Sequence, residues 1–110
     1  MTAQGKGASE SQRVVIEACL RNGVPFWWRG RGTLLVNGDG VPSVLADIEA
    51  RGETVIGLEG FELESTIIHP RIDLIYDADT AMRGGAVAVA TEWGPDVWLD
   101  VTLQGKKRDS

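Results

Sequence analysis

Residues 54–76 alternate apolar and polar side chains, and this period of two constrains the fold of the 110-residue chain more than any other feature. Such alternation predicts β-strands that cover one face and leave the other open. Ile56 and Leu58 should share one face, whereas Phe61 lies at an odd-numbered position. We therefore expect a β-bulge or a tight turn at Glu59–Gly60 to shift the register.

Two other segments space their apolar residues as a helix does. Ser9 and Gln12 match a capping box, and the apolar positions that follow recur every three or four residues until a glycine. This pattern predicts a helix over 10–21, with Cys19 on its buried side. Ser43 can cap a second helix that ends before Gly52.

The remaining apolar runs have the composition of strands. Residues 24–30 and 32–38 predict a strand, a turn and a strand, with Arg29 and Arg31 exposed at the corner. Residues 85–93 and 97–103 flank a Gly-Pro-Asp turn, which predicts a hairpin in the same way.

In that hairpin, Trp93 would lie opposite Trp98 on one face of the sheet. The predicted fold is thus an α+β domain, with a mainly antiparallel sheet of five to seven strands and two helices on one face.

The length and composition fit one compact domain over 9–104, with a flexible N-terminus at 1–8 and a flexible basic tail at 105–110. Apolar residues make up 43% of the chain, which argues against general disorder. The single cysteine excludes an internal disulfide. We find neither a secretory leader nor an apolar run of membrane-spanning length, so we expect a cytoplasmic protein with no membrane partner.

The net charge of −5 is concentrated in the middle of the chain. Residues 44–100 carry twelve acids and three arginines, a balance of −9. An acidic surface repels nucleic acid and attracts basic proteins, so we expect no nucleic-acid partner despite the Trp-Trp-Arg-Gly-Arg-Gly run at 27–32. Tryptophan and arginine are also common at the centres of protein interfaces, so that run predicts either a hairpin corner or a contact patch.

These observations predict a face that binds a basic protein. Carboxylates of the central strands would form it, and exposed tryptophans would anchor the partner. The predicted partner-binding residues are Glu59, Glu62, Glu64, Asp73, Asp77, Trp28, Trp98 and Asp100.

Other functions have weaker support in the sequence. His69, Arg71 and Asp73 have the residue types of a base, an anion clamp and an orienting carboxylate, which is the pattern for a small-molecule binder or a modest enzyme. Asp77 and Asp79 lack further metal ligands at a recognisable spacing, and no cofactor signature occurs, so we predict no metal and no cofactor. A tryptophan face that pairs with a second copy of the chain is a third alternative.

Residues 45–79 contain a helix, a strand that ends in a Gly-x-x-Gly-Phe bend, a second strand, a proline and an acidic strand. The residues that carry this pattern are Gly57, Gly60, Phe61, Pro70, Asp73 and Asp77. The stretch resembles small immunity proteins of bacterial polymorphic toxin systems. The resemblance implies a cytoplasmic protein that binds and blocks a cognate toxin without chemistry of its own. We therefore expect a stoichiometric inhibitor of a basic toxin or nuclease.

Overall fold

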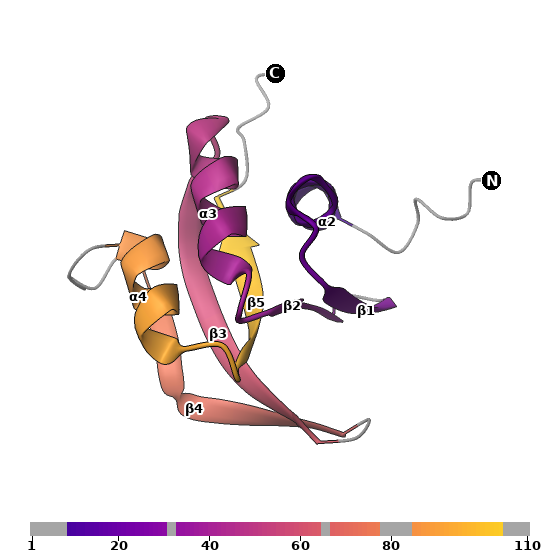
Figure 1. Ribbon diagram of the computed structural model, residues 1–110, viewed down its shortest axis with the longest axis vertical. Coiled ribbons are helices and arrows are strands. Elements are labelled where there is room, and N and C mark those ends of the chain that lie inside the picture. Colours follow the sequence, from indigo (N-terminus) through magenta and orange to yellow (C-terminus); the bar gives the residue numbers. More distant parts are fainter. Residues whose placement is uncertain (1–8, 31–32, 65–66, 78–84, 105–110) are drawn as a thin grey trace.

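The computed structural model describes residues 9–30, 33–64, 67–77 and 85–104 (Figure 1). The predicted flexible segments, 1–8 and 105–110, lie outside these residues, as does Asp79. The elements in chain order are α2 (Glu10–Asn22), β1 (Phe26–Gly30), β2 (Thr33–Asn37), α3 (Val41–Ala50), β3 (Val55–Glu64), β4 (Ile67–Asp77), α4 (Gly85–Trp93) and β5 (Trp98–Leu103).

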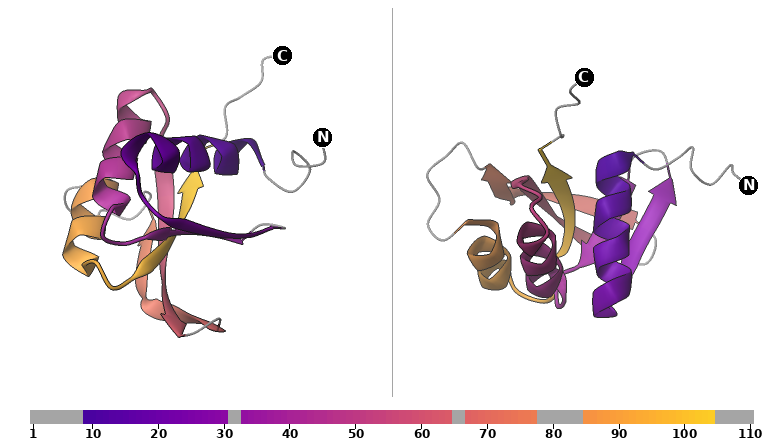
Figure 2. Two further views of the ribbon diagram at one scale, coloured as in Figure 1. Left: turned by 45° about the vertical axis from the view of Figure 1, so that its right-hand side comes forward. Right: turned by 90° about the horizontal axis from the view of Figure 1, so that it is seen from above.

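The five strands form one antiparallel sheet in the order β1-β2-β5-β3-β4. The helices α4, α3 and α2 lie side by side along one face of this sheet (Figures 1 and 2). The α+β class and the antiparallel sheet are confirmed, but the described residues place three helices on the face where two were predicted. The opposite face is not covered by any helix of the described part of the chain.

The predicted strand over 85–93 is wrong, because these residues form α4. Alanine and valine alternate there and match a strand, but alanine is also the best helix former. Ala86, Val89 and Ala90 are buried, and Trp93 packs partly buried against the same core. These positions follow helical spacing, so tertiary packing selects the helix. Trp93 consequently does not pair with Trp98.

The core lies between the helices and the sheet, and its buried residues are all apolar among those described. Residues that are completely buried include Val15, Cys19, Leu45, Ile48 and Leu99. Burial raises the pKa of the Cys19 thiol to about 11, which agrees with its predicted place on the inner side of a helix. At neutral pH this thiol remains protonated and acts as a small hydrophobic side chain.

The first helix begins and ends as the sequence predicts. Ser9 and Gln12 form a reciprocal capping box, and Gly23 ends α2 with a φ of 65°. The second helix differs in one detail. Its N-cap is Gly40 and a proline occupies its first turn, so Ser43 lies inside α3 rather than at its cap.

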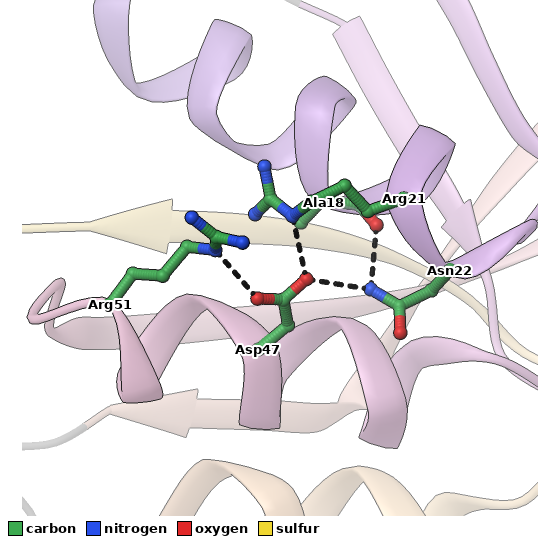
Figure 3. Close-up of polar contacts among 5 residues, drawn as sticks. All are labelled: Ala18, Arg21, Asn22, Asp47 and Arg51. Carbon is green, nitrogen blue, oxygen red and sulfur yellow. Dashed lines mark hydrogen bonds and ion pairs between the residues drawn. The ribbon is translucent and has the colours of Figure 1, made fainter.

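Asp47 joins α3 to α2 through polar contacts (Figure 3). Its carboxylate accepts hydrogen bonds from Arg21 Nε at 3.0 Å, Asn22 Nδ2 at 2.8 Å and Arg51 Nε at 2.8 Å. The two arginines hold the pKa of Asp47 at about 2, well below its ordinary value. One acid of the central segment is therefore engaged by cations on the helix side.

The register between β3 and β4 shifts between Glu59 and Gly60, as predicted. Glu59 pairs with Ile75 and Gly60 pairs with Arg71, so residues 72–74 are extra on β4. Within this bulge, Leu74 packs over Gly60, where an added Cβ would lie 2.8 Å from Leu74 Cβ. Only glycine permits this close approach of the two strands.

A second irregularity lies at the start of β3. The pairing of β3 with β5 shifts between Val55 and Gly57, and Ile56 is 37% exposed while Leu58 is buried. The prediction that Ile56 and Leu58 share a face is therefore wrong, because the bulge turns Ile56 away from the core.

Candidate functional site

The sheet face opposite the helices, here called the open face, is built from alternate residues of all five strands. Leu34, Val36, Leu58, Leu99 and Val101 point into the core, so their strand neighbours point the other way. The register aligns Trp27 with Leu35, Asp100 with Glu59 and Trp98 with Phe61. The open face consists of Trp27, Leu35, Trp98, Asp100, Thr102, Gly57, Glu59, Phe61, Pro70, Ile75 and Asp77.

Two carboxylates lie side by side near the middle of this face. Glu59 on β3 pairs with Asp100 on β5, and directly opposed residues of antiparallel strands place their Cβ atoms about 5 Å apart. Burial, and to a lesser extent the charge of Glu59, together raise the pKa of Asp100 to about 6. Neither carboxylate forms an ion pair or a side-chain hydrogen bond within the described ranges.

Aromatic and aliphatic side chains surround these carboxylates. Leu35 is only 1% exposed although it lies outside the main core, and its cross-strand neighbour is Trp27. Trp98 and Phe61, which pair across β5 and β3, are each half-buried. The open face thus carries a second, smaller apolar cluster around charged groups, an arrangement that strengthens electrostatic interactions there.

The predicted anchor Trp28 does not belong to this face. It pairs with Leu34 and packs against the main core, so it points to the helix side of the sheet and away from the face that carries Trp98. Its indole Nε1 is buried and has no hydrogen-bond partner among the residues described. The side chains of Arg29 and Arg31, predicted to be exposed at the same corner, lie outside what the structure describes.

The six predicted partner-binding carboxylates divide into two groups. Glu59, Asp77 and Asp100 lie on the open face with Trp98. The remaining three, Glu62, Glu64 and Asp73, lie elsewhere on the β3–β4 hairpin and are engaged by its two cationic or ionisable side chains.

Arg71 accounts for two of those three acids. Its Nη1 lies 2.9 Å from Glu62 Oε2, and its Nη2 lies 2.9 Å from Asp73 Oδ2. Arg71 Nε also donates to Asp73 Oδ1 at 3.0 Å, and this bidentate contact lowers the pKa of Asp73. His69 Nε2 lies 3.2 Å from Glu64 Oε1, so its partner is not Asp73. Of the three groups in the alternative prediction, Arg71 and Asp73 are therefore paired, whereas His69 contacts a different carboxylate.

Sequence reasoning missed the exposed isoleucines. Large hydrophobic residues that are exposed among those described are Leu20, Ile56, Ile67, Ile72 and Ile75. Four of these five lie on the β3–β4 hairpin, and Ile72 is 84% exposed. The alternation places Ile75 beside the acids, which was an available signal. The sequence also predicts the register shift at Glu59–Gly60, but it does not indicate that the extra residues of this shift lie on β4, where they include the exposed Ile72.

Two hollows adjoin these isoleucines. The larger, of about 450 Å³, lies over Gly57 and is lined by Ile56, Gly57, Leu58, Glu59, Ile75, Tyr76, Asp77 and Thr102. The smaller, of about 70 Å³, is lined by Glu59, Gly60, Phe61, Pro70, Arg71, Ile72 and Ile75. Glu59 and Ile75 line both hollows and form the ridge between them.

In the described part of the chain, no three metal-ligating side chains of histidine, cysteine, aspartate or glutamate gather as a metal site would require. No helix within the described ranges is both long and apolar enough to cross a membrane. Comparisons with protein-family models, with curated proteins and with solved structures found no match to this chain.

Proposed function

We propose that this protein binds a basic protein partner through the open face. The observation that carries the proposal is the Glu59–Asp100 pair, two carboxylates held together on a partly apolar sheet surface with no cation from the described residues beside them. A cationic group of a partner would neutralise both charges, and the partial burial of Asp100 would make its contact with that group stronger than a contact in open water.

The surroundings of the pair support a protein as the partner. Trp98 and Phe61 are only half-buried, and tryptophan is a frequent anchor at interface centres. Exposed isoleucines continue this surface onto β4, and contiguous exposed apolar residues mark interaction surfaces. A second copy of the chain docked on the same face would bring carboxylates against carboxylates, so the surface favours a different, basic protein.

The biological role that we propose is stoichiometric inhibition of a basic toxin or nuclease. Such an enzyme carries a cationic surface for its phosphate-bearing substrate, and an acidic protein that covers this surface would block it without chemistry. Electrostatic attraction would also speed the encounter between the two proteins. This role agrees with the resemblance of residues 45–79 to immunity proteins.

Affinity capture with matched variants tests the proposal. The tagged protein and its Glu59→Gln/Asp100→Asn variant are incubated with lysate of the source organism in low and high salt. The control variant Glu49→Gln/Glu92→Gln removes the same charge from exposed helix positions.

We expect the protein and the control to retain a basic protein at low salt, and the open-face variant to lose it. The retained protein is then assayed for toxin or nuclease activity, which one equivalent of this chain should block. Equal retention by both variants, or no basic protein retained, would contradict the proposal.

A further inference from the structure

The larger hollow exists because β3 carries a glycine at its floor. Gly57 lies between Thr102 on β5 and Asp77 on β4, and an added Cβ there would meet Thr102 Cβ and Tyr76 O at 3.5 Å, an ordinary contact distance. The strand would therefore accept a side chain at this position, but glycine leaves the space empty. Glu59 lies two residues along the strand and contributes a carboxylate to the wall.

The smaller hollow differs in chemistry. Its walls include Phe61, Pro70, Ile72 and Ile75. Ile72, which lies in the β4 bulge, and Ile75, which pairs with Glu59, are both exposed to solvent. A space of about 70 Å³ with these walls suits a small aliphatic group, whose burial would cover the exposed isoleucines. The two hollows are centred about three residues apart along β3, or roughly 10 Å at the rise of a strand.

We infer that the two hollows bind two side chains of the partner. An arginine or lysine side chain would lie over Gly57, and an aliphatic side chain would lie beside Phe61 and Ile75. The inference rests on the proposed function and adds the recognition element that a partner must present. Charge selects the occupant of the first hollow, because Glu59 lines it and Asp100 lies across the strand from Glu59. Shape and hydrophobicity select the occupant of the second.

Synthetic peptides provide a direct probe of this pair. The peptide Arg-Gly-Gly-Gly-Leu-Gly places an arginine and a leucine on the same side of an extended chain, about 13 Å apart, a separation that the flexible arginine side chain can shorten. Two comparison peptides replace either the arginine or the leucine by serine. Binding is followed through amide chemical shifts of the full-length protein. We expect the first peptide to shift residues of the open face and to bind at least tenfold more tightly than either comparison peptide.

Variants test each hollow separately. Gly57→Val should place a branched side chain on the floor of the first hollow and weaken binding of the first peptide at least tenfold. A circular dichroism spectrum checks that the fold persists. Ile75→Lys places the protein's own cation on the ridge and should have the same effect if Gly57→Val fails to fold. The control Ile67→Lys changes an isoleucine that is 58% exposed on the same strand but lines neither hollow. Ile67→Lys should bind like the unmodified protein.

The outcomes separate this inference from the proposed function. Glu59→Gln/Asp100→Asn could abolish peptide binding while Gly57→Val and Ile75→Lys leave it unchanged. That result would show that the two hollows do not recognise the peptide, whereas the carboxylates of the open face do. Equal binding of all three peptides would likewise overturn the paired recognition. If the Glu59→Gln/Asp100→Asn variant binds as tightly as the unmodified protein, both the inference and the proposed function are wrong.

Discussion

Replacement of Asp100 by asparagine should stabilise the protein at neutral pH, although it removes a residue that we assign to the binding face. The pKa of Asp100 rises from 3.8 to about 6 in the folded protein because the carboxylate is partly desolvated and faces Glu59. Keeping it ionised at pH 7 therefore costs folding free energy. Asparagine has the same shape without the charge.

The magnitude follows from the size of the shift. A displacement of about two pH units corresponds to about 3 kcal/mol, at 1.36 kcal/mol per unit. Asp100 retains some contact with water, which screens both its desolvation and its repulsion from Glu59, so we expect a gain of about 1 to 2 kcal/mol. Destabilising charge of this kind is typical where function and stability compete.

The sign of the pH dependence is specific. A carboxyl group with a raised pKa in the folded state contributes stability below its unfolded pKa of 3.8, and that contribution is lost as the pH rises through about 6. The free energy of unfolding of the Asp100→Asn variant should therefore equal that of the unmodified protein near pH 3.5. Between pH 4 and pH 7 it should exceed that of the unmodified protein by an increasing amount. Urea unfolding followed by circular dichroism at several pH values measures this difference.

An exposed acid supplies the control. Glu92→Gln on α4 should change the free energy of unfolding by less than about 0.5 kcal/mol at every pH. The explanation would be refuted if Asp100→Asn raised the free energy of unfolding by the same amount at every pH, or lowered it at pH 7. Either result would show that burial and the charge of Glu59 do not destabilise ionised Asp100.

Three further predictions concern binding and packing. If the partner requires ionised Asp100, a pKa of about 6 predicts that affinity, measured by calorimetry, falls about tenfold from pH 7 to pH 5, whereas Asp100→Asn should show a much weaker dependence. Gly60→Ala should cost about 1 to 3 kcal/mol in urea unfolding, because its Cβ would lie 2.8 Å from Leu74 Cβ. Asp47→Asn should lower the melting temperature at pH 7, because the contact of the carboxylate with Arg21 is lost. Since the pKa of Asp47 is depressed to about 2, the difference in melting temperature from the unmodified protein should narrow as the pH falls from 4 to 2. A difference that stays constant over this range would contradict the prediction.

The first helix and the β1–β2 hairpin could be predicted from the sequence, because short-range interactions determine where they begin and end. The capping box at Ser9 and the left-handed stop at Gly23 act within a few residues, so their prediction needs no knowledge of the rest of the fold. The register shift at Glu59–Gly60 was predictable for a similar reason, because the apolar positions change parity there. The charge balance could also be read from the sequence, since residues 44–100 carry twelve acids and three arginines whatever the fold.

Tertiary structure decided which side those charges occupy. An alternating Ala-Val run satisfies both a strand and a helix, and it becomes α4 because its buried positions 86, 89 and 90 pack against the core beside α3. With three helices on one face, Trp28 is directed into the core while Trp98, Glu59 and Asp100 are left on the other. Sequence periodicity determines that the faces of a strand differ, but only long-range packing determines which face is covered.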